Sequence, residues 1–162
     1  MTGPLPDVEV VDLAATGITC GRRHQNGTEC AKPVGHRGDC WATWTIRAEG
    51  ERPLTTNRVA NLHRRTWAKH TAEIRGRWHL LGLEAGVTRL EACTVTVVPL
   101  HRNGSSPQDV AACAPEAKAA VDGLVDAGLV VDDDARHITR ITFEPPRICG
   151  VNGLELTIEE TP

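Results

Sequence analysis

Residues 109–134 read DVAACAPEAKAAVDGLVDAGLVVDDD, and this segment is the most informative part of the chain because both ends of one helix are marked in it. Pro115 suits the first helical position, and Glu116 favours the positive end of the helix dipole. Gly128 can adopt the left-handed conformation that ends a helix. The stretch therefore predicts a helix over about 115–127, followed by an apolar triplet and three aspartates.

Four shorter runs of alternating or β-branched residues predict strands on either side of this helix. They cover residues 41–47, 94–100, 138–143 and 154–158. Pro99 indicates that the second of these strands ends there or lies at a sheet edge. Apolar residues at helical intervals from Asn57 to Leu83 predict a second amphipathic helix, with a break near Gly76. The alternation of strands and helices predicts an α+β fold without internal repeats.

The composition is that of one soluble domain. The chain has 162 residues, of which 40% are apolar and 24% are charged. One Phe, no Tyr and four Trp predict a mostly aliphatic core and argue against aromatic platforms for base stacking. No run approaches the ~18 apolar residues of a membrane span, and residues 1–6 lack the features of a secretory signal. We therefore expect a cytoplasmic protein without a membrane partner.

Acidic side chains gather in sequence around the helix at 115–127. Two carboxylates ~4 Å apart repel by about 4 kcal/mol at an effective dielectric of 20, so a folded site that collects them needs a cation or a proton. Magnesium (Mg2+) suits such oxygen ligands. The aspartates at 132–134 are therefore either a solvated turn or part of a cation site. Lys118, one turn before Asp122, makes either a weak surface ion pair or a contact that stabilises a phosphate in the transition state.

The helix predicted from Asn57 is rich in basic residues. This surface is either a solvated helix face or a site for DNA phosphates, and the second reading predicts an affinity that falls steeply with salt. The candidate DNA-binding residues are Asn57, Arg58, Arg64, Arg65, Lys69, Arg75 and Arg77.

The stretch at 109–134 resembles the signature of RusA-type Holliday junction resolvases. In that family an acidic D-x-D-N segment precedes a K-x-x-x-D helix and an A-G-hydrophobic-D-D turn. The residues on this pattern are Lys118, Asp122, Ala127, Gly128, Asp132 and Asp133. PLTTNR at 53–58 resembles the family's early P-x-x-N element, and the resemblance runs from about Trp44 to Glu159. It departs from the pattern at Ala111 and Ala112, where the family has Asp and Asn.

The resemblance implies a small mixed sheet packed with two main helices, in a homodimeric endonuclease that cuts branched DNA with Mg2+. It implies that Asp109 and Asp133 are metal ligands with Asp132 beside them. Lys118 would assist at the phosphate, which makes Asp109, Lys118 and Asp133 the candidate catalytic residues. An alternative is a catalytically impaired DNA-binding module, because Ala111 removes an acidic ligand.

A second group of candidate ligands lies in the N-terminal part of the chain. Its spacing is C-x9-C-x5-H-x3-C, formed by Cys20, Cys30, His36 and Cys40. The segment is poor in aliphatic residues, so three readings stay open: structural zinc (Zn2+), a reduced metal-free segment, or a disulfide. We expect a flexible leader over 1–18, a zinc-like module over 19–42 and a resolvase-like domain over 43–160. A third functional reading makes the zinc-like module a DNA-binding adaptor.

Overall fold

The computed structural model describes residues 43–86, 89–104 and 109–161. Within these residues the elements alternate between strands and helices, so the predicted α+β class is confirmed. In chain order they are β1 (Thr43–Glu49), α1 (Thr56–Ala60), α2 (Arg64–Glu84), β2 (Cys93–His101), α3 (Ala114–Asp126), β3 (Ile138–Phe143), β4 (Arg147–Ile148) and β5 (Gly153–Glu160). The predicted leader and Cys/His module lie outside the described residues. No helix in the described ranges is long and apolar enough to cross a bilayer.

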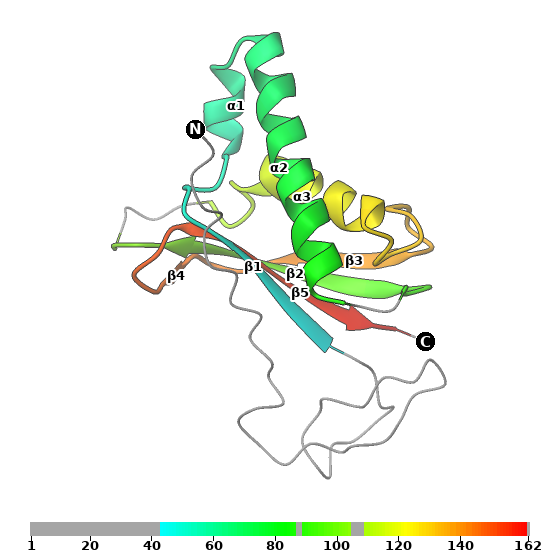
Figure 1. Ribbon diagram of the computed structural model, residues 1–162. Helices are drawn as coiled ribbons and strands as arrows, with labels where there is room; N and C mark the ends of the chain where they lie inside the picture. Colours follow the sequence, from blue (N-terminus) through cyan, green and yellow to red (C-terminus); the bar gives the residue numbers. More distant parts are fainter. Residues whose placement is uncertain (1–42, 87–88, 105–108, 162) are drawn as a thin grey trace.

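The sheet is mixed, and the two main helices cover one of its faces (Figure 1). The strand order is β1-β5-β2-β3, and the short strand β4 also pairs with β2. Strand β5 is antiparallel to both β1 and β2, whereas β3 and β4 are parallel to β2. The mixed sheet with two main helices, which the family resemblance implied, is therefore present.

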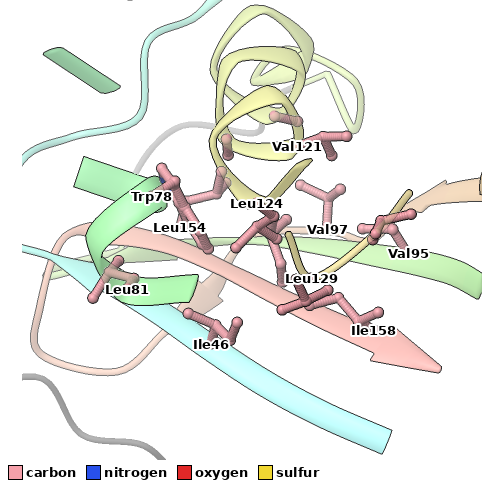
Figure 2. Packing of buried hydrophobic residues seen from close by; sticks show 14 of the residues in the cluster. Ile46, Trp78, Leu81, Val95, Val97, Val121, Leu124, Leu129, Leu154 and Ile158 are labelled. Carbon is pink, nitrogen blue, oxygen red and sulfur yellow. The ribbon is translucent and has the colours of Figure 1, made fainter. Parts of the chain in front are cut away.

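The core lies between this sheet and helices α2 and α3. Every second residue of a strand points to the same face, so the register Val95↔Ile158 and Val97↔Leu156 places four aliphatic side chains in one layer. Trp78 of α2, which is fully buried, packs in the same cluster (Figure 2). The layer of aliphatic residues explains how a chain with so few aromatic residues forms a continuous core.

Helix α3 matches its prediction closely, because its end signals are local. It begins one residue before Pro115, and Gly128 adopts the left-handed conformation, with φ of 78°. The helix passes very near α2 at Gly123. A Cβ atom at this position would collide with the main-chain carbonyl of Arg75 and lie 2.8 Å from the Cβ of Trp78. Glycine therefore permits the close crossing that fixes α3 against α2.

The break in the first helical region differs from its prediction. The chain leaves the helix after α1 and re-enters it at Arg64, whereas the helix continues through Gly76. Asn61 ends α1 through its backbone N–H, and His63 starts α2 with a side chain that accepts a hydrogen bond from the Arg65 backbone N–H. Since one helical glycine costs only ~1 kcal/mol relative to alanine, the caps decide the position of the break.

The prediction that Pro99 ends its strand or lies at a sheet edge is wrong. Strand β2 continues to His101 and has neighbours on both sides. Pairing with β3 ends at Val97↔Phe143, and pairing with β4 begins at Leu100↔Arg147. Pro99 falls between these two ladders, where the missing N–H deprives neither strand of a hydrogen bond.

Candidate nucleic-acid site

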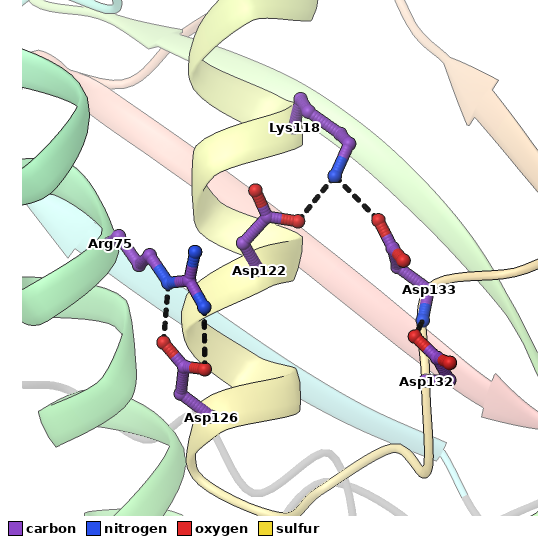
Figure 3. Close-up of polar contacts among 6 residues, drawn as sticks. All are labelled: Arg75, Lys118, Asp122, Asp126, Asp132 and Asp133. Carbon is purple, nitrogen blue, oxygen red and sulfur yellow. Dashed lines mark hydrogen bonds and ion pairs between the residues drawn. The ribbon is translucent and has the colours of Figure 1, made fainter. Parts of the chain in front are cut away.

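Lys118 joins helix α3 to the acidic turn that follows it. Its Nζ donates to Oδ1 of Asp122 and to Oδ2 of Asp133, the second at 2.5 Å (Figure 3). The i,i+4 spacing places Lys118 and Asp122 on one side of the helix. The structure thus brings together two of the three residues that the resemblance marks as catalytic.

A short main-chain connection places the acidic turn beside α3. After Gly128 the chain reverses, and Leu90 then holds it by two backbone hydrogen bonds, from Leu90 N to Leu129 O at 2.8 Å and from Val131 N to Leu90 O at 3.3 Å. These bonds form a parallel bridge between Leu90 and Val130. The two backbone bonds to Leu90, just before β2, therefore hold the start of the acidic turn. Asp133 reaches Lys118 without a long connecting loop.

Charge pairing shapes the ionisation of this group. The hydrogen bond from Lys118 lowers the pKa of Asp133 below its ordinary value. Burial lowers the pKa of Lys118, but the contacts with Asp122 and Asp133 together outweigh it, so that the Lys118 pKa is raised. At neutral pH one ammonium group therefore lies between two carboxylates, which leaves one net negative charge.

The other two aspartates of the turn have different roles. Oδ1 of Asp132 accepts a hydrogen bond of 2.8 Å from the backbone N–H of Asp133, which stiffens the turn. Asp134 pairs with Arg136 and, at 2.8 Å, with Nδ1 of His137. Among the described residues, the Asp134 carboxylate bonds only within its own local loop. It therefore does not belong to the Lys118 group, which consists of Lys118, Asp122 and Asp133.

Asp109 lies in the segment before α3, and its carboxylate is exposed. Its Oδ1 accepts a local hydrogen bond of 3.1 Å from the Ala111 backbone N–H. In the part of the chain that the structure describes, no three His, Cys, Asp or Glu side chains are grouped so that they could hold a metal ion. The predicted set of Asp109, Asp132 and Asp133 is therefore not assembled as a three-ligand group.

Ala111 and Ala112, at the positions where the family has Asp and Asn, accept hydrogen bonds through their main-chain carbonyl groups. The carbonyl of Ala111 accepts a hydrogen bond of 3.0 Å from Ala114 N, and the carbonyl of Ala112 accepts one of 2.9 Å from Thr56 N. The second bond ties the start of α1 to the segment that precedes α3. This contact brings the PLTTNR element at 53–58 close to the start of α3.

The predicted DNA-binding residues of α2 point in several directions. Arg75 and Arg77 are two residues apart, which places them about 200° apart around the helix. Arg75 forms a bidentate pair with Asp126, whereas Arg77 donates to the carbonyl oxygen of Glu49. Nζ of Lys69 lies 3.7 Å from Oε1 of Glu73, one turn along the helix. The basic residues of α2 therefore do not share one face.

The remaining predicted DNA contacts are solvent-exposed. Asn57, Arg58, Arg64 and Arg65 all lie on α1 or the first turn of α2. Among the described residues, no carboxylate forms an ion pair with any of these three arginines. They are free to contact a polyanion on the side of the molecule formed by α1 and the start of α2.

Glu116 is a buried carboxyl group whose surroundings the sequence reasoning missed. It accepts a hydrogen bond from the Leu54 backbone N–H, 62 residues away in sequence, and it borders a cavity of about 290 Å³. Burial raises the pKa of Glu116 above its ordinary value, although the Leu54 N–H and Arg77 oppose the shift. The available signal was its position, because i+4 and i+7 from Glu116 are Ala120 and Gly123, on the buried face of α3.

Arg52 also lines this cavity, and sequence reasoning did not single it out because no periodic pattern includes it. The charged and titratable residues that line this cavity are Arg52, Arg58, Arg77, His70, Glu51, Glu73 and Glu116. The described surface near the start of α3 is therefore strongly charged, and Lys118 lies one turn further along the same helix.

No protein-family model matches this chain, and no curated protein matches it either.

Proposed function

We propose that this chain is a magnesium-dependent, structure-selective endonuclease that acts on Holliday junctions or related branched DNA. The observation that carries the proposal is the position of Lys118 between Asp122 and Asp133. These three residues lie on the helix and turn that resemble the resolvase signature. The exposed arginines of α1 and the first turn of α2 supply positive charge for the DNA backbone.

Two of the three proposed magnesium ligands, Asp132 and Asp133, are neighbours, whereas Asp109 does not join them in a three-ligand group in the described residues. Magnesium in proteins is usually held by one or two carboxylates, with water and substrate phosphates completing the shell. Asp132 and Asp133, adjacent on a stiffened turn, offer two such carboxylates, and Asp109 is the further ligand that the resemblance implies. When bound, the ion would polarise a phosphodiester and orient the attacking water. Lys118 would stabilise the negative charge that develops on the phosphate oxygens.

The homodimer that the resemblance implies would fit the symmetry of the proposed substrate. A four-way junction has approximate two-fold symmetry, and a homodimer with two-fold symmetry presents the same group of residues twice. Each protomer would then apply one Lys118 group to one DNA strand. Paired cuts at symmetry-related positions are the expected product.

A second candidate function is binding of branched DNA without cleavage. Two observations favour it: alanine occupies both positions where the family has Asp and Asn, and the described residues hold no group of three metal-ligating side chains. A chain of this kind would shield or mark a junction. Its DNA-binding surface would be the same as that of the nuclease.

A cleavage assay on a synthetic four-way junction separates these functions. We expect the wild-type protein to nick two strands symmetrically when Mg2+ is added. Asp133→Asn and Lys118→Met should each lower the rate by about 100-fold, the usual size of a lost transition-state contact. The matched control is Glu84→Gln, which removes an exposed carboxylate at the far end of α2 and should leave the rate unchanged.

The assay also shows which reading fails. Junction binding without nicking at any Mg2+ concentration would establish the second candidate in place of the first. Absence of both binding and nicking would overturn both. Equal rates for the wild type and Asp133→Asn would show that a detected activity does not come from the Lys118 group.

A further inference from the structure

We propose that Arg52 and Arg58 form a phosphate-binding subsite at the start of α3, separate from the Lys118 group. The subsite deepens the proposed function because it assigns one DNA phosphate to two named residues. Only the assignment to DNA rests on that function. The affinity for a phosphate group follows from the cavity itself.

The subsite is a cavity of about 150 Å³. One buried water needs roughly 10–15 Å³ of such space, so a tetrahedral oxyanion fits in the cavity. The lining residues come from the segment before α1, from α1, from β2 and from the N-terminal cap of α3. They are Arg52, Pro53, Thr55, Arg58, His101 and Cys113.

The balance of charge in this cavity favours an anion. The larger cavity beside it shares Arg52 and Arg58, but three glutamates line it as well. Among the residues that the structure describes, no carboxylate lines the smaller cavity. Throughout the described residues, no carboxylate forms an ion pair with Arg52 or Arg58, whereas Arg47, Arg75, Arg136 and Arg147 all have such a partner. Two arginine side chains that form no ion pair with a described carboxylate therefore line one hollow.

The start of α3 makes a smaller contribution to the potential at this hollow. The helix has 13 residues, and Cys113 at its N-cap makes no side-chain hydrogen bond to the first turn. The Ala111 carbonyl accepts from the Ala114 N–H and Glu116 lies in the first turn, so the helix dipole is partly offset and the two arginines supply most of the positive charge. Burial raises the pKa of the Cys113 thiol to about 11, so this side chain is neutral and does not repel an anion.

Phosphate suits these groups better than a carboxylate does. A guanidinium group presents paired N–H donors that match two oxygens of a phosphate, and two arginines can contact a tetrahedral anion from different sides. The hydroxyl of Thr55 accepts a hydrogen bond of 3.4 Å from the Arg58 backbone N–H, and its own proton can still be donated. The source of the phosphate is either the DNA backbone or a free phosphate compound.

Two titrations of the full-length chain test the subsite and identify the source. The first measures binding of inorganic phosphate by calorimetry. The second measures binding of a fluorescent four-way junction by anisotropy across a salt series without Mg2+. The variants are Arg52→Ala, Arg58→Ala and their combination. The matched control is Arg140→Ala, an exposed arginine on β3 that lines neither cavity.

We expect the double variant to lose at least tenfold in phosphate affinity, with the control unchanged. Each alanine should also make the plot of log K against log salt concentration shallower by roughly 0.9, the contribution of one phosphate contact. Because both side chains are exposed, the melting temperatures should stay equal. Arg52→Lys and Arg58→Lys, which keep the charge but lose the paired donors, should bind phosphate with intermediate affinity.

The two titrations have distinct outcomes. Loss of phosphate binding with an unchanged DNA salt slope would support the subsite and assign it to a free phosphate compound. A shallower DNA slope without measurable phosphate binding would support it and assign it to the DNA backbone. If the wild type binds no DNA, the proposed function fails while the phosphate titration still decides the subsite. Double-variant affinities equal to those of the wild type for both probes would overturn the subsite.

Discussion

Replacing Gly123 with alanine should destabilise the fold, although alanine is the better helix former. The new Cβ would meet the carbonyl oxygen of Arg75, and it would lie 2.8 Å from the Cβ of Trp78 and 2.9 Å from the backbone nitrogen of His79. Two of these atoms belong to the α2 backbone and cannot move alone. Overpacking of this kind costs about 1–3 kcal/mol, and the helix propensity of alanine offsets about 1 kcal/mol of it.

Gly76→Ala is the matched control for this prediction. Gly76 is also inside a helix, but a Cβ there has nothing within 4 Å. The substitution should stabilise the protein by about 0.5–1 kcal/mol, whereas Gly123→Ala should destabilise it by up to about 2 kcal/mol after the offset. Urea unfolding followed by tryptophan fluorescence measures both free energies. Equal effects of the two substitutions would refute the close contact between α2 and α3.

Two further predictions concern ionisation. Since the pKa of Glu116 is raised in the folded state, stability should fall as pH rises from the ordinary glutamate pKa through the raised value. Glu116→Gln keeps an acceptor for the Leu54 N–H and should flatten this fall in urea unfolding between about pH 4 and pH 8; an unchanged profile would contradict the assignment. Lys118 lowers the pKa of Asp133 in the folded state. The contact between the two side chains therefore stabilises the fold above the ordinary aspartate pKa, and this stabilisation is lost as pH falls through the lowered value. Lys118→Met should raise the Asp133 pKa in a carboxyl NMR titration, and no change would show that the two groups do not touch in solution.

Local signals predicted most of the fold. Pro115 and Gly128 delimit α3 in sequence, and the helix occupies the predicted range to within one residue at each end. Alternating or β-branched runs likewise located β1, β2, β3 and β5, whereas the short strand β4 was not predicted. Pro99 was misread because its tolerance depends on a change of partner strand, and no local pattern shows that change.

The candidate site was predicted less completely than the fold. The contact between Lys118 and Asp133 follows a motif that lies within 16 consecutive residues, and the structure contains it. The cavity beside Glu116 is lined by residues far apart in sequence, and the hydrogen bond from Leu54 to Glu116 spans 62 residues, so no local pattern indicates it. The fold also divides the basic residues of α2 among several directions, because some of them pair with Glu73, Asp126 or a backbone carbonyl.

The most direct test of branched DNA as the substrate is a comparison of binding affinities in the absence of Mg2+. A four-way junction and a linear duplex of the same arm sequences are titrated with the wild-type chain at one salt concentration. We predict that the junction binds at least tenfold more tightly than the duplex and that both affinities fall as salt is added. Equal affinity for the two DNAs, or no binding to either, would contradict the account.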